Sequence, residues 1–106
     1  MRRRPFRILY DPEVAGQVAT LGRRWYGLIR RTIEEQLVYE PHVETRNRKP
    51  LRQPSALAEA WELRFGPDNA LRVFYRFDVG RREVRVVAAG EKRGNRLFIG
   101  GMEFEL

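Results

Sequence analysis

The chain has 106 residues, 42% of them apolar, which suits one domain with enough apolar surface for a core. It contains no cysteine and a single histidine, His42, which excludes disulfides, cysteine-based zinc sites and histidine-rich metal centres. The net charge of +7 favours a polyanionic partner, either nucleic acid or an acidic protein segment, although the same charge also keeps a small protein soluble. No stretch approaches the ~20 apolar residues of a membrane span, so we expect a cytoplasmic protein without a membrane partner.

The first 39 residues predict a strand and two helices. Residues 6–10, "FRILY", alternate as in a strand, and Asp11 is a predicted helix N-cap. Apolar residues then recur at spacings of three and four, as in an amphipathic helix. Because Gly22 is unfavourable inside a helix, we predict two helices, 12–21 and 24–39, packed as a hairpin. The alternative is one bent helix, since the apolar stripe keeps its phase across Gly22.

The rest of the chain predicts a loop followed by an antiparallel meander. The loop holds three of the six prolines and several basic residues, and a short tail ends the chain. The expected class is therefore α+β: a small antiparallel β-sheet with the helical hairpin on one face, forming a single domain over residues 1–106. The expected segments are a loop at 41–58, strands at 60–65, 71–79 and 83–90, a basic turn "GEKRGN", a short strand "RLFIG" and the tail "GMEFEL".

Arginines mark one face of the predicted sheet. Arg64, Arg72 and Arg76 share side-chain parity on neighbouring strands, and such strands lie ~4.8 Å apart, so their guanidinium groups can converge. One interpretation is a phosphate-binding surface. The other is a solvated face in which Glu62 and Asp78 form local ion pairs with the arginines. The spacing alone does not separate the two.

Two further features of this region have both a functional and a structural interpretation. Phe74 lies among the arginines, where a base can stack on it, or where the C-terminal tail can cover it. The glycine-bounded stretch 90–96, "GEKRGNR", predicts a basic turn whose backbone a ligand can approach closely. Its glycine spacing is not that of a nucleotide-binding loop.

Three stretches together resemble a known family. They are "NRKPLR" at 47–52, "AWELRFGPDNALRVFYRFD" at 60–78 and "VRVVAAGEKRGNRLF" at 84–98. Preceded by a strand and a helical hairpin, they are similar to the RelE/ParE superfamily of bacterial type II toxins. The resemblance implies a RelE-like fold and a ribosome-dependent mRNA endonuclease. Such enzymes use the RNA 2′-hydroxyl as nucleophile and basic side chains to stabilise the phosphate, with no metal and no cofactor.

The resemblance also implies site residues. Arg64, Arg72 and Lys92 match basic positions of the family, and Glu62 replaces a lysine and becomes the candidate base. Phe98 stands where RelE has a tyrosine, so the hydroxyl of that residue is missing. Arg93 takes the place of Lys92 if the turn shifts by one residue. The supporting RNA-binding residues are expected to be Arg76, Arg93, Lys49, Arg52, Phe74 and Arg96.

The implied partners are a cognate antitoxin protein, the ribosome and mRNA. Two alternatives stay open: a ParE-like inhibitor of DNA gyrase, and a non-toxic antitoxin-binding or corepressor module. The arginine set favours the nuclease, whereas Glu62 and Phe98 favour the gyrase inhibitor.

Overall fold

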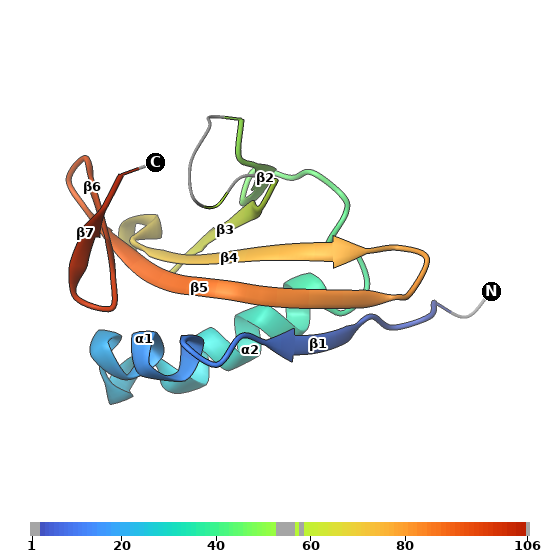
Figure 1. The fold of residues 1–106 in the computed structure, drawn as a ribbon, viewed down its shortest axis with the longest axis horizontal. Coiled ribbons are helices and arrows are strands. Elements are labelled where there is room, and N and C mark those ends of the chain that lie inside the picture. The colour runs from blue at the N-terminus through green and yellow to red at the C-terminus, as the bar shows by residue number, and fades with distance from the viewer. Residues whose placement is uncertain (1–2, 53–56, 58, 106) are drawn as a thin grey trace.

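A single sheet with two helices on one face organises the chain in the computed structural model, which describes residues 3–52, 57 and 59–105 (Figure 1). The strand order is β2-β3-β4-β5-β6-β7, and β1 pairs with β5. The expected α+β class and the helical layer on one face are confirmed. The strands are β1 (Arg7–Tyr10), β2 (Arg48–Pro50), β3 (Trp61–Phe65), β4 (Leu71–Asp78), β5 (Glu83–Arg93), β6 (Arg96–Ile99) and β7 (Met102–Phe104).

The helical region divides where a glycine was expected to break it. Helix α1 (Val14–Leu21) ends at Gly22, whose φ of 107° is accessible mainly to glycine. A short 3-10 turn (Arg23–Trp25) then leads into α2 (Tyr26–Leu37). No helix in the described residues is long and apolar enough to cross a membrane.

The predicted N-cap at Asp11 is wrong. Helix α1 begins at Val14 without a side-chain cap, and the Asp11 carboxylate instead accepts a hydrogen bond from Arg85 Nη1 at 3.0 Å. Because β1 lies parallel to the start of β5, this carboxylate sits near a basic residue that is 74 positions away in the chain. The tertiary ion pair therefore replaces the local cap.

The sheet is antiparallel except for the β1–β5 pair, which is parallel. Strand β5 is long enough to pair with β1 along its first half and with β6 along its second half. The sequence patterns missed β2, which lies in the predicted loop, and β7, which lies in the predicted tail. Each has three residues, too few for a periodic signal, and each is held by pairing with an adjacent strand.

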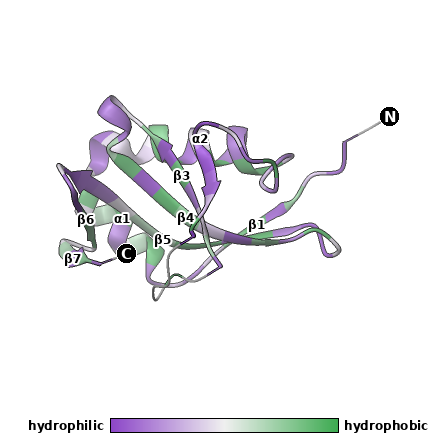
Figure 2. Ribbon diagram, turned by 90° about the horizontal axis from the view of Figure 1, so that it is seen from above, coloured by the Kyte–Doolittle hydropathy of each residue, from purple (hydrophilic) through white to green (hydrophobic). Residues whose placement is uncertain are grey.

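Both faces of the sheet are partly covered. The helix side carries the main core, which includes Ile33, Leu37, Leu63, Val73 and Tyr75. Figure 2 shows hydrophobic bands separated by hydrophilic ones along the long strands, as alternation requires. A second apolar cluster lies on the other face and consists of Leu57, Ala60, Phe74, Ala88 and Leu97.

The predicted basic turn at 90–96 begins later than expected. Strand β5 continues to Arg93, and the reversal is made at Gly94, with φ of 62°. Gly90 is a strand residue, and a Cβ atom there would lie 2.3 Å from the backbone oxygen of Phe98. This glycine thus allows β6 to approach β5 closely rather than a ligand to approach the backbone.

Candidate nucleic-acid interface

A hollow of about 440 Å³ lies on the sheet face opposite the helices, and six of the ten predicted site residues line it. We call it the basic groove. Strands β2, β3, β4 and β5 and the segment after β2 form its walls. Its lining residues are Glu44, Lys49, Pro50, Leu51, Arg52, Glu62, Arg64, Arg72 and Lys92.

Strand register explains why these side chains meet. Lys49 pairs with Glu62 across β2 and β3, and Arg64 pairs with Arg72 across β3 and β4. Lys92 shares the parity of the β5 residue opposite Arg72, so its side chain leaves the sheet on the same face. Alternate positions on four neighbouring strands therefore converge on one hollow.

An ion-paired triad forms the floor of the groove. Glu62 Oε1 accepts a hydrogen bond from Arg64 Nε at 2.7 Å, and Glu62 Oε2 accepts one from Arg72 Nη1 at 3.1 Å. Arg72 Nε donates to the backbone oxygen of Asn69 at 2.9 Å. The side chains of Glu62 and Arg72 are 4% and 8% exposed, whereas that of Arg64 is 41% exposed. Of the three, Arg64 is the residue that presents charge to the groove.

The rim of the groove is also mainly cationic. Lys49 and Arg52 are exposed, Lys92 is half-buried, and Arg52 pairs with Glu44 at 3.3 Å. The lining set holds five basic and two acidic side chains, a formal charge of +3. A concave surface of one sign concentrates the field and raises the local concentration of anions.

Four of the predicted site residues lie outside the groove. Arg76 is an exposed residue further along β4, where it pairs with Arg85 of β5. Arg93 is exposed, donates to Glu91 and lies 4.5 Å from the ring centre of Phe98. The side chain of Arg96 lines a separate hollow at the β6–β7 hairpin.

The expectation that Phe74 stacks on a base is wrong. Its parity does place it on the arginine face, but its side chain is fully buried in the second apolar cluster. In this cluster Phe74 lies with Leu57 and Ala60, which precede β3, and with Leu97 of β6. The alternative, covering by the C-terminal tail, is correct in part: Phe104 of the tail packs against this cluster, but its buried members lie outside the tail.

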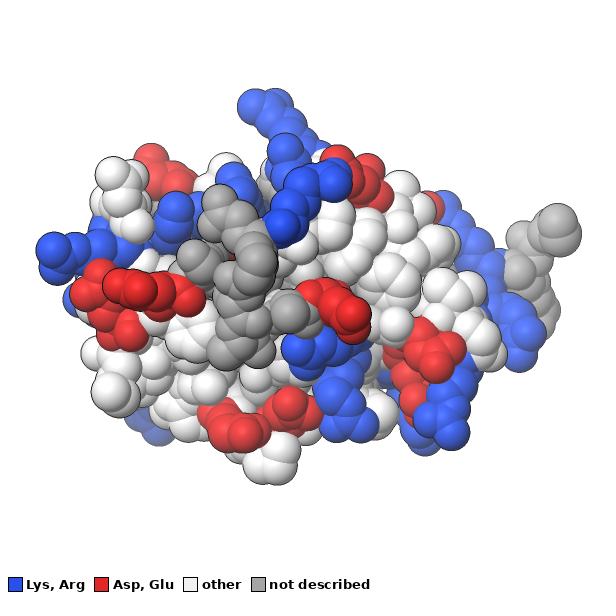
Figure 3. Space-filling view, turned by 45° about the horizontal axis from the view of Figure 1, so that its top comes forward, with Lys and Arg blue, Asp and Glu red and all other residues white. Residues whose placement is uncertain are grey.

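Charge is not continuous over the surface around the groove. In Figure 3 acidic side chains are interspersed with lysines and arginines on the face shown.

Arg48, in the basic stretch 47–52, is not a surface residue at all. It is 6% exposed, and it donates from Nη1 to the Gln36 backbone oxygen at 2.6 Å and from Nε to that of Val43 at 3.2 Å. Its role is to tie the loop to the C-terminal end of α2, where a cation is favoured.

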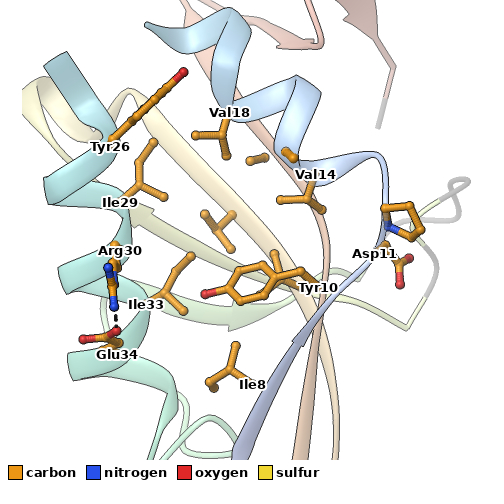
Figure 4. Close-up of a pocket in the computed structure, with 15 residues that line it drawn as sticks. Ile8, Tyr10, Asp11, Val14, Val18, Tyr26, Ile29, Arg30, Ile33 and Glu34 are labelled. Carbon is orange, nitrogen blue, oxygen red and sulfur yellow. Dashed lines mark hydrogen bonds and ion pairs between the residues drawn. The ribbon is translucent and has the colours of Figure 1, made fainter. Parts of the chain in front are cut away.

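A second, apolar groove of about 850 Å³ opens on the helix side (Figure 4). Side chains of β1, α1 and α2 line it, among them Ile8, Val18 and Ile29. Tyr10 and Tyr26 are exposed at this groove. Burial, with a smaller contribution from the nearby Glu34 carboxylate, raises the pKa of Tyr10 above its usual value.

The fold is shared with a toxin–antitoxin complex. One chain of the crystal structure of RelBE2 from Mycobacterium tuberculosis superimposes with a TM-score of 0.67, covering 83% of this chain and 92% of that one. The two sequences are 23% identical over the match, so the similarity establishes a RelE-like fold. No family model and no curated protein sequence matches the chain.

Proposed function

We propose that the protein is the toxin of a type II toxin–antitoxin system and that it cleaves mRNA on the ribosome. The basic groove carries this proposal, because one hollow is lined by four cations from neighbouring strands and by Arg52, which follows β2. A single-stranded RNA backbone has matching charge and can follow such a groove. The fold shared with a chain of a toxin–antitoxin complex supports the wider class.

In the proposed reaction the RNA 2′-hydroxyl attacks the adjacent phosphorus. The new 2′-O–P bond forms as the bond to the 5′-oxygen breaks, and the hydroxyl proton leaves to a base while the 5′-oxygen takes up a proton. Negative charge grows on the non-bridging oxygens, and Arg64 and Lys92 are placed to stabilise it. Arg72 contributes charge from the floor of the groove.

Expression in a growing bacterium tests the proposal. We expect growth arrest and, in primer extension on abundant mRNAs, cuts within translated codons. Arg64→Ala should weaken the cuts strongly, whereas Arg81→Ala should retain them, because Arg81 is an exposed residue outside the groove. Arrest that leaves mRNA intact, in wild type, would reject the nuclease.

A ParE-like inhibitor of DNA gyrase is the second candidate. Two observations favour it: both oxygens of Glu62 already accept hydrogen bonds from arginines, and Phe98 has no hydroxyl to take part in proton transfer. The distinguishing result is a change in plasmid supercoiling without cleavage of mRNA. Expression without any growth arrest would instead support a non-toxic binding module.

We also propose that an antitoxin segment with apolar side chains docks in the apolar groove. Ala15 is exposed on α1 and lines this groove, whereas Ala19 is exposed on the same helix and does not. Ala15→Glu should therefore prevent neutralisation by the protein encoded in an adjacent small reading frame, and Ala19→Glu should not. Equal neutralisation of both variants would place the antitoxin elsewhere, with the basic face as the other candidate surface.

A further inference from the structure

We infer that Glu62 is a positioning residue that orients Arg64 toward the phosphate, and that it does not serve as the base for cleavage. The effect of this positioning on catalysis rests on the proposed function. The contacts that show how Arg64 is held do not depend on that function.

A continuous chain of contacts fixes the Arg64 side chain. The Asn69 carbonyl holds Arg72, Arg72 holds Glu62, and Glu62 holds Arg64, at distances of 2.9, 3.1 and 2.7 Å. The Asn69 residue lies in the short turn between β3 and β4, so the chain of contacts starts on backbone. Exposure of the three side chains is 8%, 4% and 41% in the same order. Of these three side chains, only that of Arg64 reaches well into the groove.

The position of Glu62 does not suit a general base. A base must come within ~2.6–3.2 Å of the hydroxyl it deprotonates, and this carboxylate is almost completely covered. Each of its oxygens already accepts a hydrogen bond from a guanidinium group. A proton accepted here would also neutralise the anion between Arg64 and Arg72, which are directly opposed across β3 and β4. Like charges in such a pair repel each other.

Positioning by Glu62 suits the way arginine binds phosphate. The contact with Glu62 uses the Nε–H of Arg64, one of the five N–H donors of a guanidinium group. Fixing Nε also fixes the plane of the group, and bidentate binding of a phosphate depends on that plane. A side chain that is already ordered loses less conformational entropy when the ligand binds.

A double-mutant cycle on RNA cleavage tests the inference. The variants are Glu62→Gln, Arg64→Ala and the combination of both. Glu83→Gln is the matched control, because Glu83 is also a strand carboxylate that accepts a hydrogen bond from an arginine, Arg7 at 2.6 Å, but it lies outside the groove. If Glu62 acts through Arg64, we expect Glu62→Gln to lower kcat/KM at least tenfold in the wild-type background and to have no further effect in the Arg64→Ala background. The acidic limb of the pH–rate profile should be the same in wild type and Glu62→Gln.

A base would give a different result. Glu62→Gln would then lower kcat by the same factor in both backgrounds, and the acidic limb of the profile would disappear. Either observation overturns the inference. Thermal melting confirms that each variant is folded. If Glu62→Gln is not, Glu62→Asp replaces it in the cycle, because aspartate keeps the charge but is too short to hold both arginines. The double-mutant cycle alone then decides, since aspartate keeps a titratable carboxyl group.

A readout without catalysis separates this inference from the proposed function. The Nε–H resonance of Arg64, assigned by its loss in Arg64→Ala, should exchange slowly with solvent in wild type and in Glu83→Gln. It should exchange fast in Glu62→Gln. Slow exchange in Glu62→Gln would overturn the positioning role even if RNA is cleaved. If wild type does not cleave RNA, the proposed function fails, and the cycle is measured instead as the Kd for a short single-stranded RNA.

Discussion

Arg64 and Arg72 look equivalent in the sequence, but we predict that their removal has different consequences. The side chain of Arg72 is 8% exposed and donates hydrogen bonds to two acceptors. The side chain of Arg64 is 41% exposed and donates to one acceptor. Arg72→Ala should therefore lower the free energy of unfolding strongly. Arg64→Ala should lower it slightly while removing the exposed charge of the groove.

The structure sets the expected magnitudes. Removing one partner of a buried ion pair costs about 3–5 kcal/mol, and a hydrogen bond to a charged group contributes about 1.5–3 kcal/mol. Since Glu62 keeps Arg64 as a partner in Arg72→Ala, we expect a loss of about 3 kcal/mol, at the lower end of the first range. For the solvent-screened Arg64 pair we expect about 1 kcal/mol at most.

Urea and thermal denaturation of the purified variants measure both losses. For a domain of this size about 1 kcal/mol shifts Tm by roughly 4–8 °C, so Arg72→Ala should melt roughly 12–24 °C below wild type and Arg64→Ala at most 4–8 °C below it. Arg81→Ala, whose side chain is 77% exposed, is the control for loss of a surface arginine. Equal losses in Arg64→Ala and Arg72→Ala would refute the division of the triad into a buried anchor and an exposed ligand-binding residue.

Three further predictions concern the packing that holds the groove in place. Gly90→Ala should destabilise the fold by several kcal/mol in urea denaturation because its Cβ would collide with β6 backbone, whereas Gly16→Ala in open space on α1 should stabilise it by up to ~1 kcal/mol. Burial raises the pKa of Tyr75, whose hydroxyl donates to a backbone carbonyl at 2.7 Å. The folded state therefore keeps this proton at pH values where the unfolded chain loses it. The free energy of unfolding should fall as the pH rises above ~10, and it should fall less in Tyr75→Phe. An equal fall in wild type and variant would contradict the raised pKa of Tyr75. Arg48→Ala should cost about 3 kcal/mol in the same assay, and a loss below about 0.5 kcal/mol would contradict its role as a buried tie to α2.

The basic groove and the apolar groove give two faces of the molecule different chemistry. The basic groove lies on the sheet face opposite the helices, and the apolar groove lies among β1, α1 and α2. A protein that presents both can hold a polyanion on one side and an apolar peptide on the other. Under the proposed function, substitutions at Ala15 and Arg64 should therefore affect antitoxin binding and toxicity separately.

The sequence by itself determined the main elements. Apolar spacings of three and four predicted both helices, Gly22 predicted the break between them, and strict alternation predicted β3, β4 and β5. Alternation also predicted that Glu62, Arg64 and Arg72 leave the sheet on one face, because side-chain direction in a strand follows from backbone geometry alone.

Only the tertiary structure decided which of those side chains are accessible. Phe74 is buried because Leu57 and Leu97, distant in the chain, fold over its face, and no local pattern encodes that contact. Arg72 is buried while Arg64 is exposed, although both have the same parity. Burial and ion pairing depend on which segments meet in space, so the residues that reach the groove were decided by long-range packing.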